Sequence, residues 1–298
     1  MSTQPLSPTG NVKNLVILAA WGDHRDRTLP PADDLRRVLN GPADLPGRVA
    51  PGGGVRDYLL AQSGGRLTVD SDVYGWFQCE TLERDNVVDL LIYEALNQLE
   101  ERGVDLRPLD QDGDGYINVT CLHSGYDASY RGYDVYGKYY RDRIWAHVGR
   151  WLEWQSKRSG VRVKDFAIIS ALHGVGGGYP VRQGVVAHEW GHLLLNLEDQ
   201  YLVGSTHPNP CLMRGTSGYY PAALCGVCRQ ELGWTKIPGP APVPPPPAPV
   251  PVPALPDYNA DPNVRRAVIL LREMYLSSTF PPIDAIAAAL APFSTVRI

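Results

Sequence analysis

Apolar positions along this 298-residue chain fall into a few runs whose lengths and spacing predict both strands and helices. Residues 14–20 and 163–172 are nearly continuous apolar stretches, which is typical of strands covered on both faces. Residues 117–120 predict a further strand. Residues 87–102 place apolar side chains at the three- and four-residue spacing of a helix.

Proline dominates residues 238–256, where it alternates with alanine and valine and predicts a semi-rigid spacer. Two helices are predicted beyond it, but about forty residues bury too little apolar surface for an independent core. That segment is expected to dock on the larger domain, to self-associate or to bind a partner, and the sequence does not choose among these. The predicted organisation is a folded domain over residues 1–237, a linker over 238–256 and a small helical segment over 257–298.

Composition narrows the class of protein. A hydrophobic content of 44% suits a folded domain with a substantial core. The net charge of −4 is small and no basic patch is present, which argues against a nucleic-acid partner. The apolar run at 14–20 is too short to span a membrane. Residues 1–13 lack the regions of a signal peptide, so the literal sequence predicts a cytoplasmic protein. The alternative is a secreted protein whose signal sequence precedes these residues.

The strongest chemical signal is the segment His188-Glu189-Trp190-Gly191-His192, an HExxH motif. Two histidines four residues apart share one face of a helix, about 6 Å apart along its axis, and can ligate one Zn²⁺. Glu189 can then act as general base on metal-bound water. The apolar residues around the motif predict a helix that runs through the core. A buried glutamate is costly to desolvate without a partner, which argues against a merely structural role.

A hydrolytic zinc site needs a third protein ligand and leaves the fourth position to water. Asp199 is the expected third ligand, and Glu198 is the alternative. On a straight helix Asp199 would lie about 10 Å beyond His192. The chain must therefore leave the helix near Asn196, a residue type that tolerates left-handed backbone. Tyr201 could donate its hydroxyl to the oxyanion that develops during hydrolysis, although ordinary packing explains it equally well.

The segment from His188 to Tyr201 resembles the HExGH…DxY signature of secreted bacterial zinc peptidases of the immune inhibitor A-like and IgA-peptidase-like families. The spacing of Asp199 is closer to the IgA-peptidase-like form, and Leu195 stands where a small residue is usual. Weaker collinear matches extend the resemblance over roughly residues 17–234: VRDY at 55–58, SGGRL at 63–67, VYGW at 73–76, DQDGDGY at 110–116 and IWAH at 144–147.

This resemblance implies a metzincin-like α+β catalytic domain with a mixed sheet, an active-site helix and a methionine turn beneath the zinc. Met213, which follows the motif, is then the methionine of that turn. An ordinary gap-filling methionine is the alternative. The implied activity is that of a zinc endopeptidase acting on a protein or peptide substrate.

Three of the five cysteines, Cys211, Cys225 and Cys228, follow the motif. Cys225 and Cys228 form a CxxC pair, a spacing that structural zinc sites use. Cys211 and His207 would complete a tetrahedral set, and IgA-peptidase-like proteins similarly pair a Cys-x-Met segment with a downstream CxxC. A disulfide from Cys211 to one member of the pair is an open alternative. So is a redox CxxC, although no βαβ pattern surrounds it.

Asp110, Asp112 and Asp114 alternate ahead of a glycine, as in the first half of a calcium-binding loop. With the carbonyl of Tyr116 they would offer hard oxygen ligands to Ca²⁺. The twelfth position of the loop is Cys121 instead of glutamate and a strand follows, so this is not an EF-hand. The alternative is an acidic turn whose aspartates accept hydrogen bonds from their own backbone.

The sequence thus predicts a zinc endopeptidase whose metal is held by His188, His192 and Asp199, with a second zinc and Ca²⁺ as further candidate cofactors. The rival from another class is a catalytically degenerate peptidase fold that binds proteins. The intact motif argues against that rival, whereas Leu195, at a position where the resembling families have a small residue, is compatible with it. A zinc amidase acting on cell wall is disfavoured by the family resemblance.

Overall fold

The computed structural model of this chain describes residues 9–43, 49–50, 52–174, 179–201, 208, 210–215 and 221–234. The chain divides into two units, Met1–Pro240 and Ala241–Ile298, and every described residue belongs to the first. The predicted linker at 238–256 and helical segment at 257–298 lie outside the described residues, as does His207.

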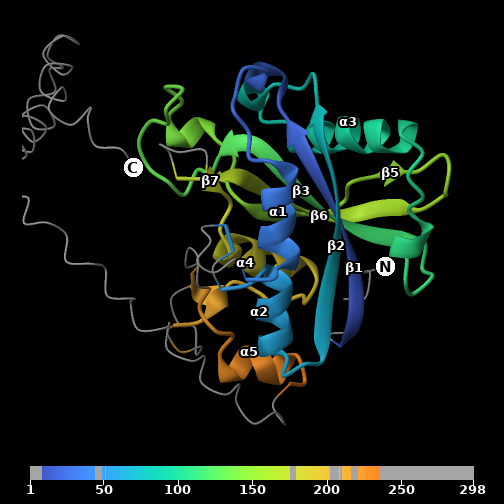
Figure 1. Cartoon of the computed structure of the whole chain (residues 1–298), viewed down its shortest axis with the longest axis vertical. Coiled ribbons are helices and arrows are strands. Elements are labelled where there is room, and N and C mark those ends of the chain that lie inside the picture. The colour runs from blue at the N-terminus through green and yellow to red at the C-terminus, as the bar shows by residue number, and fades with distance from the viewer. Residues whose placement is uncertain are drawn as a thin grey trace, which may run out of the picture. The chain divides into compact units, whose positions relative to one another are not determined.

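The described part is an α+β structure with one mixed sheet (Figure 1). The strands are β1 (Gly10–Ala20), β2 (Leu67–Gln78), β3 (Tyr116–Tyr126), β4 (His147–Gly149), β5 (Trp154–Gln155), β6 (Arg162–His173) and β7 (Tyr179–Pro180). The α-helices are α1 (Ala32–Asn40), α2 (Val55–Gln62), α3 (Val88–Glu101), α4 (Gln183–Leu193) and α5 (Gly226–Glu231). Short 3-10 turns are η1 (Gly22–His24), η2 (Glu83–Asp85), η3 (Arg107–Leu109), η4 (Tyr140–Asp142) and η5 (Leu212–Arg214).

Four long strands run parallel in the order β2-β1-β3-β6, and β4 continues the sheet beside β6 as an antiparallel strand. The two-residue strands β5 and β7 also pair with β6, both antiparallel. Parallel strands end at the same edge of a sheet, where polar side chains from different segments can meet. The carboxyl ends of β1, β3 and β6 bring Trp21, Asp127 and His173 to that edge.

Helices cover both faces of the sheet, so strand β1 is apolar on both sides. Val16 and Leu18 belong to the core under α1, α2 and α4, whereas Leu15 and Ile17 belong to the core under α3 (Figure 1). All four side chains are wholly buried. Burying one such side chain contributes about 1.5–3 kcal/mol. This two-sided burial explains why the strand appears in the sequence as an uninterrupted apolar run.

The elements predicted from the apolar runs are present. The runs at 14–20, 117–120 and 163–172 lie within β1, β3 and β6, and the helix predicted at 87–102 is α3. The strands are longer than the runs because backbone pairing continues beyond the apolar residues; β1 already pairs with β2 at Gly10 and Leu67. Among the helices of the described part, none combines the length and the apolar character that crossing a membrane requires.

Candidate metal centre

Helix α4 carries the HExxH motif through the core under the sheet. Trp190 is wholly buried and donates its indole N–H to Thr120 Oγ1 of β3 at 3.0 Å, which fixes the rotation of the helix. His188 and Glu189 are buried and His192 is half-buried. The motif therefore lies on a rigid helix, as expected from its apolar surroundings.

The chain leaves this helix where the sequence predicts. α4 ends at Leu193, and Asn196 adopts left-handed backbone with φ 54°. The Asn196 N–H donates to the His192 carbonyl at 3.2 Å, and the Leu197 N–H donates to the Gly191 carbonyl at 2.9 Å. These bonds turn the chain back toward the helix end, so the predicted break at Asn196 is confirmed.

Three atoms of metal-ligand type meet beside the end of α4. Asp199 Oδ1 lies 3.1 Å from His188 Nε2 and 3.2 Å from His192 Nε2, and the two Nε2 atoms are 3.2 Å apart. Ligands of a tetrahedral zinc with bonds of about 2.0–2.1 Å are separated by about 3.3 Å. The triangle thus has the size of one face of a zinc tetrahedron. Its third corner is Asp199, whereas Glu198 is exposed.

The hydrogen bonds of the two imidazoles direct their lone pairs into this triangle. His188 Nδ1 lies 3.0 Å from the Leu212 carbonyl oxygen, and His192 Nδ1 lies 2.6 Å from the Leu197 carbonyl oxygen. A carbonyl can only accept, so each Nδ1 carries a proton, and the neutral form of each ring presents its lone pair at Nε2. Burial lowers the pKa of His188 and favours this neutral form.

When both rings are neutral, no proton lies among these three atoms. Asp199 Oδ1 is buried, and no described residue donates a hydrogen bond to it. Two nitrogen lone pairs and a carboxylate oxygen at such short range repel one another unless a cation lies among them. Donor type, number and spacing all suit Zn²⁺.

Tyr201 holds the other oxygen of Asp199. Its hydroxyl donates to Asp199 Oδ2 at 2.6 Å, and this hydrogen bond is the main reason that the pKa of Tyr201 is raised to about 12. The tyrosine fixes the carboxylate while Oδ1 faces the histidines, as outer hydrogen bonds do for metal ligands. In this geometry the hydroxyl is engaged with Asp199, and its role as an oxyanion donor stays a prediction.

Glu189 lies beside the triangle, in the position that the motif predicts for a general base. Its side chain is buried, yet no described residue donates a hydrogen bond to its carboxylate. Burial raises the pKa of Glu189 to about 8, and the charges of Asp199 and Asp127 act in the same direction. A carboxylate kept in these surroundings is a stronger base than an exposed glutamate.

Asp127 is a neighbour of this site that sequence reasoning missed. It directly follows β3, is buried, and accepts the Ser129 N–H at 2.6 Å. Burial raises its pKa, and its charge raises the pKa of Glu189. Its place at the carboxyl end of a parallel strand is the one signal that could have found it.

Met213 lies directly against the motif. It is wholly buried in η5, and a Cβ added at Gly191 would lie 2.7 Å from its Sδ. Glycine at 191 is therefore what allows the two segments to approach. The Met213 carbonyl accepts the Gln200 N–H at 2.7 Å, while the neighbouring Leu212 carbonyl binds His188. This one turn supports both a histidine ligand and the loop that carries Asp199.

A second cluster is formed by the predicted cysteines. Cys228 Sγ lies 3.6 Å from both Cys211 Sγ and Cys225 Sγ, and the structure contains no disulfide among the three. Sulfurs bound to a tetrahedral zinc at about 2.3 Å would be about 3.8 Å apart. A hydrogen bond from Cys228 lowers the pKa of Cys211 to about 4, which favours a thiolate there. The proposed fourth ligand, His207, is outside the described residues.

The predicted calcium loop brings its three aspartates together on an exposed turn before β3. Their oxygens also accept backbone N–H groups: Asp110 from Gly115 at 3.1 Å and Asp114 from Tyr116 at 2.8 Å. Burial is the main reason that the pKa of Asp114 is raised, and the neighbouring carboxylates add to it. This geometry suits both a cation site and a self-capped turn, so calcium stays a prediction.

Comparison with known proteins assigns the chain to no family: no protein-family model and no curated protein matches it. The function is therefore inferred from the geometry of the candidate metal centre.

Proposed function

We propose that this protein is a zinc-dependent endopeptidase with a metzincin-like catalytic domain. The proposal depends above all on the triangle of His188 Nε2, His192 Nε2 and Asp199 Oδ1, with Glu189 beside it. Three protein ligands leave a fourth position for water, which is the composition of hydrolytic zinc sites. The mixed sheet, the motif on a core helix and the methionine against Gly191 support the metzincin-like assignment.

A bound Zn²⁺ would lower the pKa of a coordinated water and polarise the peptide carbonyl. Glu189 performs the proton transfer: its carboxylate accepts a proton from the attacking water and returns it to the leaving amine. Its buried surroundings raise the basicity that this role needs. The carbonyls of Leu212 and Leu197 hold the histidines in the tautomer that binds metal, and Tyr201 holds the carboxylate of Asp199.

Zinc content and hydrolysis of unfolded casein, measured with and without chelator, test this proposal. We expect zinc-dependent cleavage by the wild type, and zinc retention without cleavage in Glu189→Ala. Cleavage by that variant at the wild-type rate would overturn the mechanism. A well-folded protein that takes up no zinc and cleaves nothing would favour the rival function, a peptidase fold that only binds proteins.

A structural zinc at Cys211, Cys225 and Cys228 belongs to the same proposal. The size of the thiol triangle and its burial support it. We expect two zinc ions per wild-type chain and one in Cys228→Ser, which leaves the histidine site intact. One zinc ion per chain in both proteins would favour a disulfide or a redox pair at these cysteines instead of structural zinc.

The proposal also includes a calcium ion bound by Asp110, Asp112 and Asp114. The alternating carboxylates at the start of β3 support it. We expect added Ca²⁺ to raise the melting temperature of the wild type but not that of Asp112→Asn. An equal response of both proteins would leave the self-capped turn as the explanation.

A further inference from the structure

Tyrosine and arginine are concentrated in the segment between β3 and β4. Residues 126–143 contain six of the 16 tyrosines of the chain: Tyr126, Tyr130, Tyr133, Tyr136, Tyr139 and Tyr140. Arg131, Lys138, Arg141 and Arg143 accompany them. This composition resembles that of binding surfaces, where tyrosine gives contact area at a small entropic cost and arginine gives charged hydrogen bonds.

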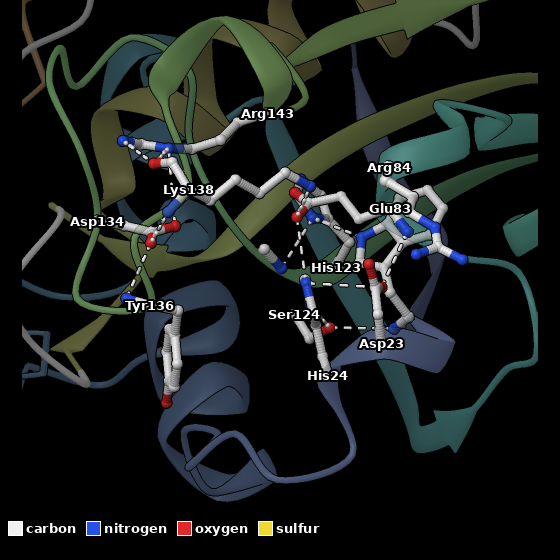
Figure 2. Close-up of polar contacts among 12 residues, drawn as sticks. Asp23, His24, Glu83, Arg84, His123, Ser124, Asp134, Tyr136, Lys138 and Arg143 are labelled. Carbon is white, nitrogen blue, oxygen red and sulfur yellow. Dashed lines mark hydrogen bonds and ion pairs between the residues drawn. The ribbon is translucent and has the colours of Figure 1, made fainter.

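The segment is held in place by two buried charged side chains. The guanidinium of Arg143 donates to the carbonyls of Asp127, Tyr130 and Gly132 at 3.2, 3.0 and 2.6 Å. The carboxylate of Asp134 accepts the N–H groups of Tyr136 and Lys138, both at 2.9 Å. Figure 2 shows the bonds of Asp134 to Tyr136 and Lys138, together with the Arg143 guanidinium, which also donates to the Lys138 carbonyl at 3.1 Å. The loop is therefore rigid without containing much regular secondary structure.

An ion pair joins this loop to η2. Lys138 Nζ lies 2.5 Å from Glu83 Oε2, and the side chain of Glu83 is wholly buried (Figure 2). His24 Nε2 lies 3.1 Å from the same oxygen. Although burial opposes it, the hydrogen bond from His24 and the charge of Lys138 lower the pKa of Glu83 to about 2. The loop and η2 thus form two walls in a fixed arrangement.

A pocket of about 710 Å³ lies between these walls. Arg84 and Asn86 line it from the side of η2, while Tyr133, Tyr139 and Arg141 line it from the loop. The volume is within the usual range for ligand sites. The pocket has aromatic side chains on one wall and hydrogen-bond donors on both.

Cationic side chains outnumber carboxylates among the described residues that line the pocket, although Arg84 Nε also lies 3.9 Å from the exposed Asp85. Lys138 and Arg143 also line it, but Glu83 and Asp134 lie behind them as buried counter-charges. Arg84 and Arg141 are exposed, and Asp142 is the one carboxylate among the described lining residues. The hydrogen bond from Arg141, helped by the charge of Arg131, lowers the pKa of Tyr140. Two guanidinium groups on opposite walls can bind a carboxylate through paired hydrogen bonds.

We propose that this pocket, lined by Arg84, Arg141, Tyr133 and Tyr139, binds an acidic side chain of the polypeptide substrate. The inference rests on the proposed function, because the peptidase reaction supplies the polypeptide. Asp127, whose charge raises the pKa of Glu189, begins the same loop, so the loop connects the pocket to the surroundings of the proposed general base. The pocket therefore gives the enzyme a preference for substrates with glutamate or aspartate at a distance from the cleaved bond.

Binding of a labelled peptide to full-length protein tests the pocket without any catalytic step. We would measure fluorescence anisotropy with a peptide in which glutamate alternates with glycine, and with its glutamine counterpart. The glutamate peptide is expected to bind more tightly, and the R84A/R141A variant is expected to bind it about tenfold more weakly or worse. The R107A/R158A variant removes two exposed arginines elsewhere and should bind like the wild type.

Equal affinity for both peptides, or unchanged binding in R84A/R141A, would overturn the inference. Inorganic phosphate that binds through the two arginines while the glutamate peptide does not would also overturn it, because the pocket would then hold a small anion. Casein hydrolysis separates this question from the proposed function. Absence of zinc-dependent casein cleavage by the wild type contradicts the peptidase, whereas equal binding of the glutamate peptide by the wild type and R84A/R141A contradicts only the pocket.

Discussion

Two clusters in this molecule each combine two histidines with a carboxylate. They differ in the positive charge that offsets the carboxylate. At the end of α4, His188, His192 and Asp199 direct three acceptor atoms at one point with no proton between them. In the Glu83 cluster of His24, His123 and Glu83 (Figure 2), Lys138 supplies the charge. The first cluster needs a bound cation to offset its three acceptor atoms, whereas the second has the Lys138 ammonium group.

The two clusters also differ in the direction of the hydrogen bonds that their imidazole rings make. In the Glu83 cluster, His123 Nδ1 accepts from Trp21 Nε1 at 3.1 Å and from the Gly125 N–H at 3.0 Å, so its proton lies on Nε2. In the candidate metal centre both Nδ1 atoms face carbonyl oxygens, so in the neutral rings both Nε2 atoms are unprotonated. Residue types alone do not define a metal site; the backbone groups that fix each imidazole proton do.

The largest difference is expected when one histidine is removed from each cluster. His192→Ala should lose the catalytic zinc and lower peptidase activity by a factor of about 10³ or more, since activation of the water is lost. His24→Gln should keep both the zinc and the specific activity of the folded protein. Metal analysis and casein hydrolysis on the two variants measure this. Equal zinc loss from both would show that the clusters are not distinct in function.

Removing the cation from the Glu83 cluster should mainly affect stability. Lys138→Met leaves a buried carboxylate without its ammonium partner, which is expected to cost about 3–5 kcal/mol in the free energy of unfolding. In chelated protein, Asp199→Asn should change the free energy of unfolding by less than about 1 kcal/mol, because asparagine keeps an oxygen that can accept the Tyr201 hydroxyl and removes the negative charge that faces the two Nε2 lone pairs. Urea unfolding of both variants compares the clusters directly.

The double variant Glu83→Gln/Lys138→Met serves as the control for that comparison. It removes both charges, so much of the stability lost in Lys138→Met should return. A double variant as unstable as the single one would mean that the lysine acts through packing and not through its charge.

Acid should destabilise the protein through His123. Burial lowers the pKa of His123 to about 3, below the ordinary value of 6.5, so the unfolded chain takes up the proton first. Stability is therefore full above pH 6.5 and falls as the pH drops toward 3. This group alone should remove about 2 kcal/mol between pH 7 and pH 5. His123→Asn keeps an acceptor and should show a shallower decrease in melting temperature; an equally steep one would assign the effect elsewhere.

The candidate metal centre could be predicted from the sequence because its parts are local. One short stretch of sequence contains His188, His192 and Asp199. Helix periodicity, together with a residue at 196 that accepts left-handed backbone, is therefore enough to predict that they meet. The Glu83 cluster had no such signal. His24, Glu83, His123 and Lys138 come from four separate segments and meet only through strand order and loop contacts.

The fold was predictable to a similar degree. Strands covered on both faces, such as β1 and β6, appear as apolar runs, but β2 contains Asp70, Ser71 and Asp72 and was not predicted as a strand. Its order beside β1 depends on pairing between distant residues, which local pattern does not encode. The place of Asp127 near the site could not be predicted for the same reason. Its electrostatic effect on Glu189 depends on how β3 and α4 pack.

The smallest effect is expected at Tyr201, which, among the described residues of the candidate metal centre, is hydrogen-bonded to Asp199. Tyr201→Phe removes the hydroxyl that donates to Asp199 Oδ2 at 2.6 Å. Loss of such an outer hydrogen bond should weaken zinc affinity by about tenfold, measured by competition with a chromogenic chelator.

Activity at saturating zinc then separates the two roles of this tyrosine. If Tyr201 only positions Asp199, kcat returns to the wild-type value once the site is filled, because nothing that touches the substrate has changed. If the hydroxyl instead donates to the oxyanion, kcat stays low at every zinc concentration while KM is little affected. The position of Oδ1 in this structure, held by a donor on Oδ2 and by nothing else among the described residues, favours recovery.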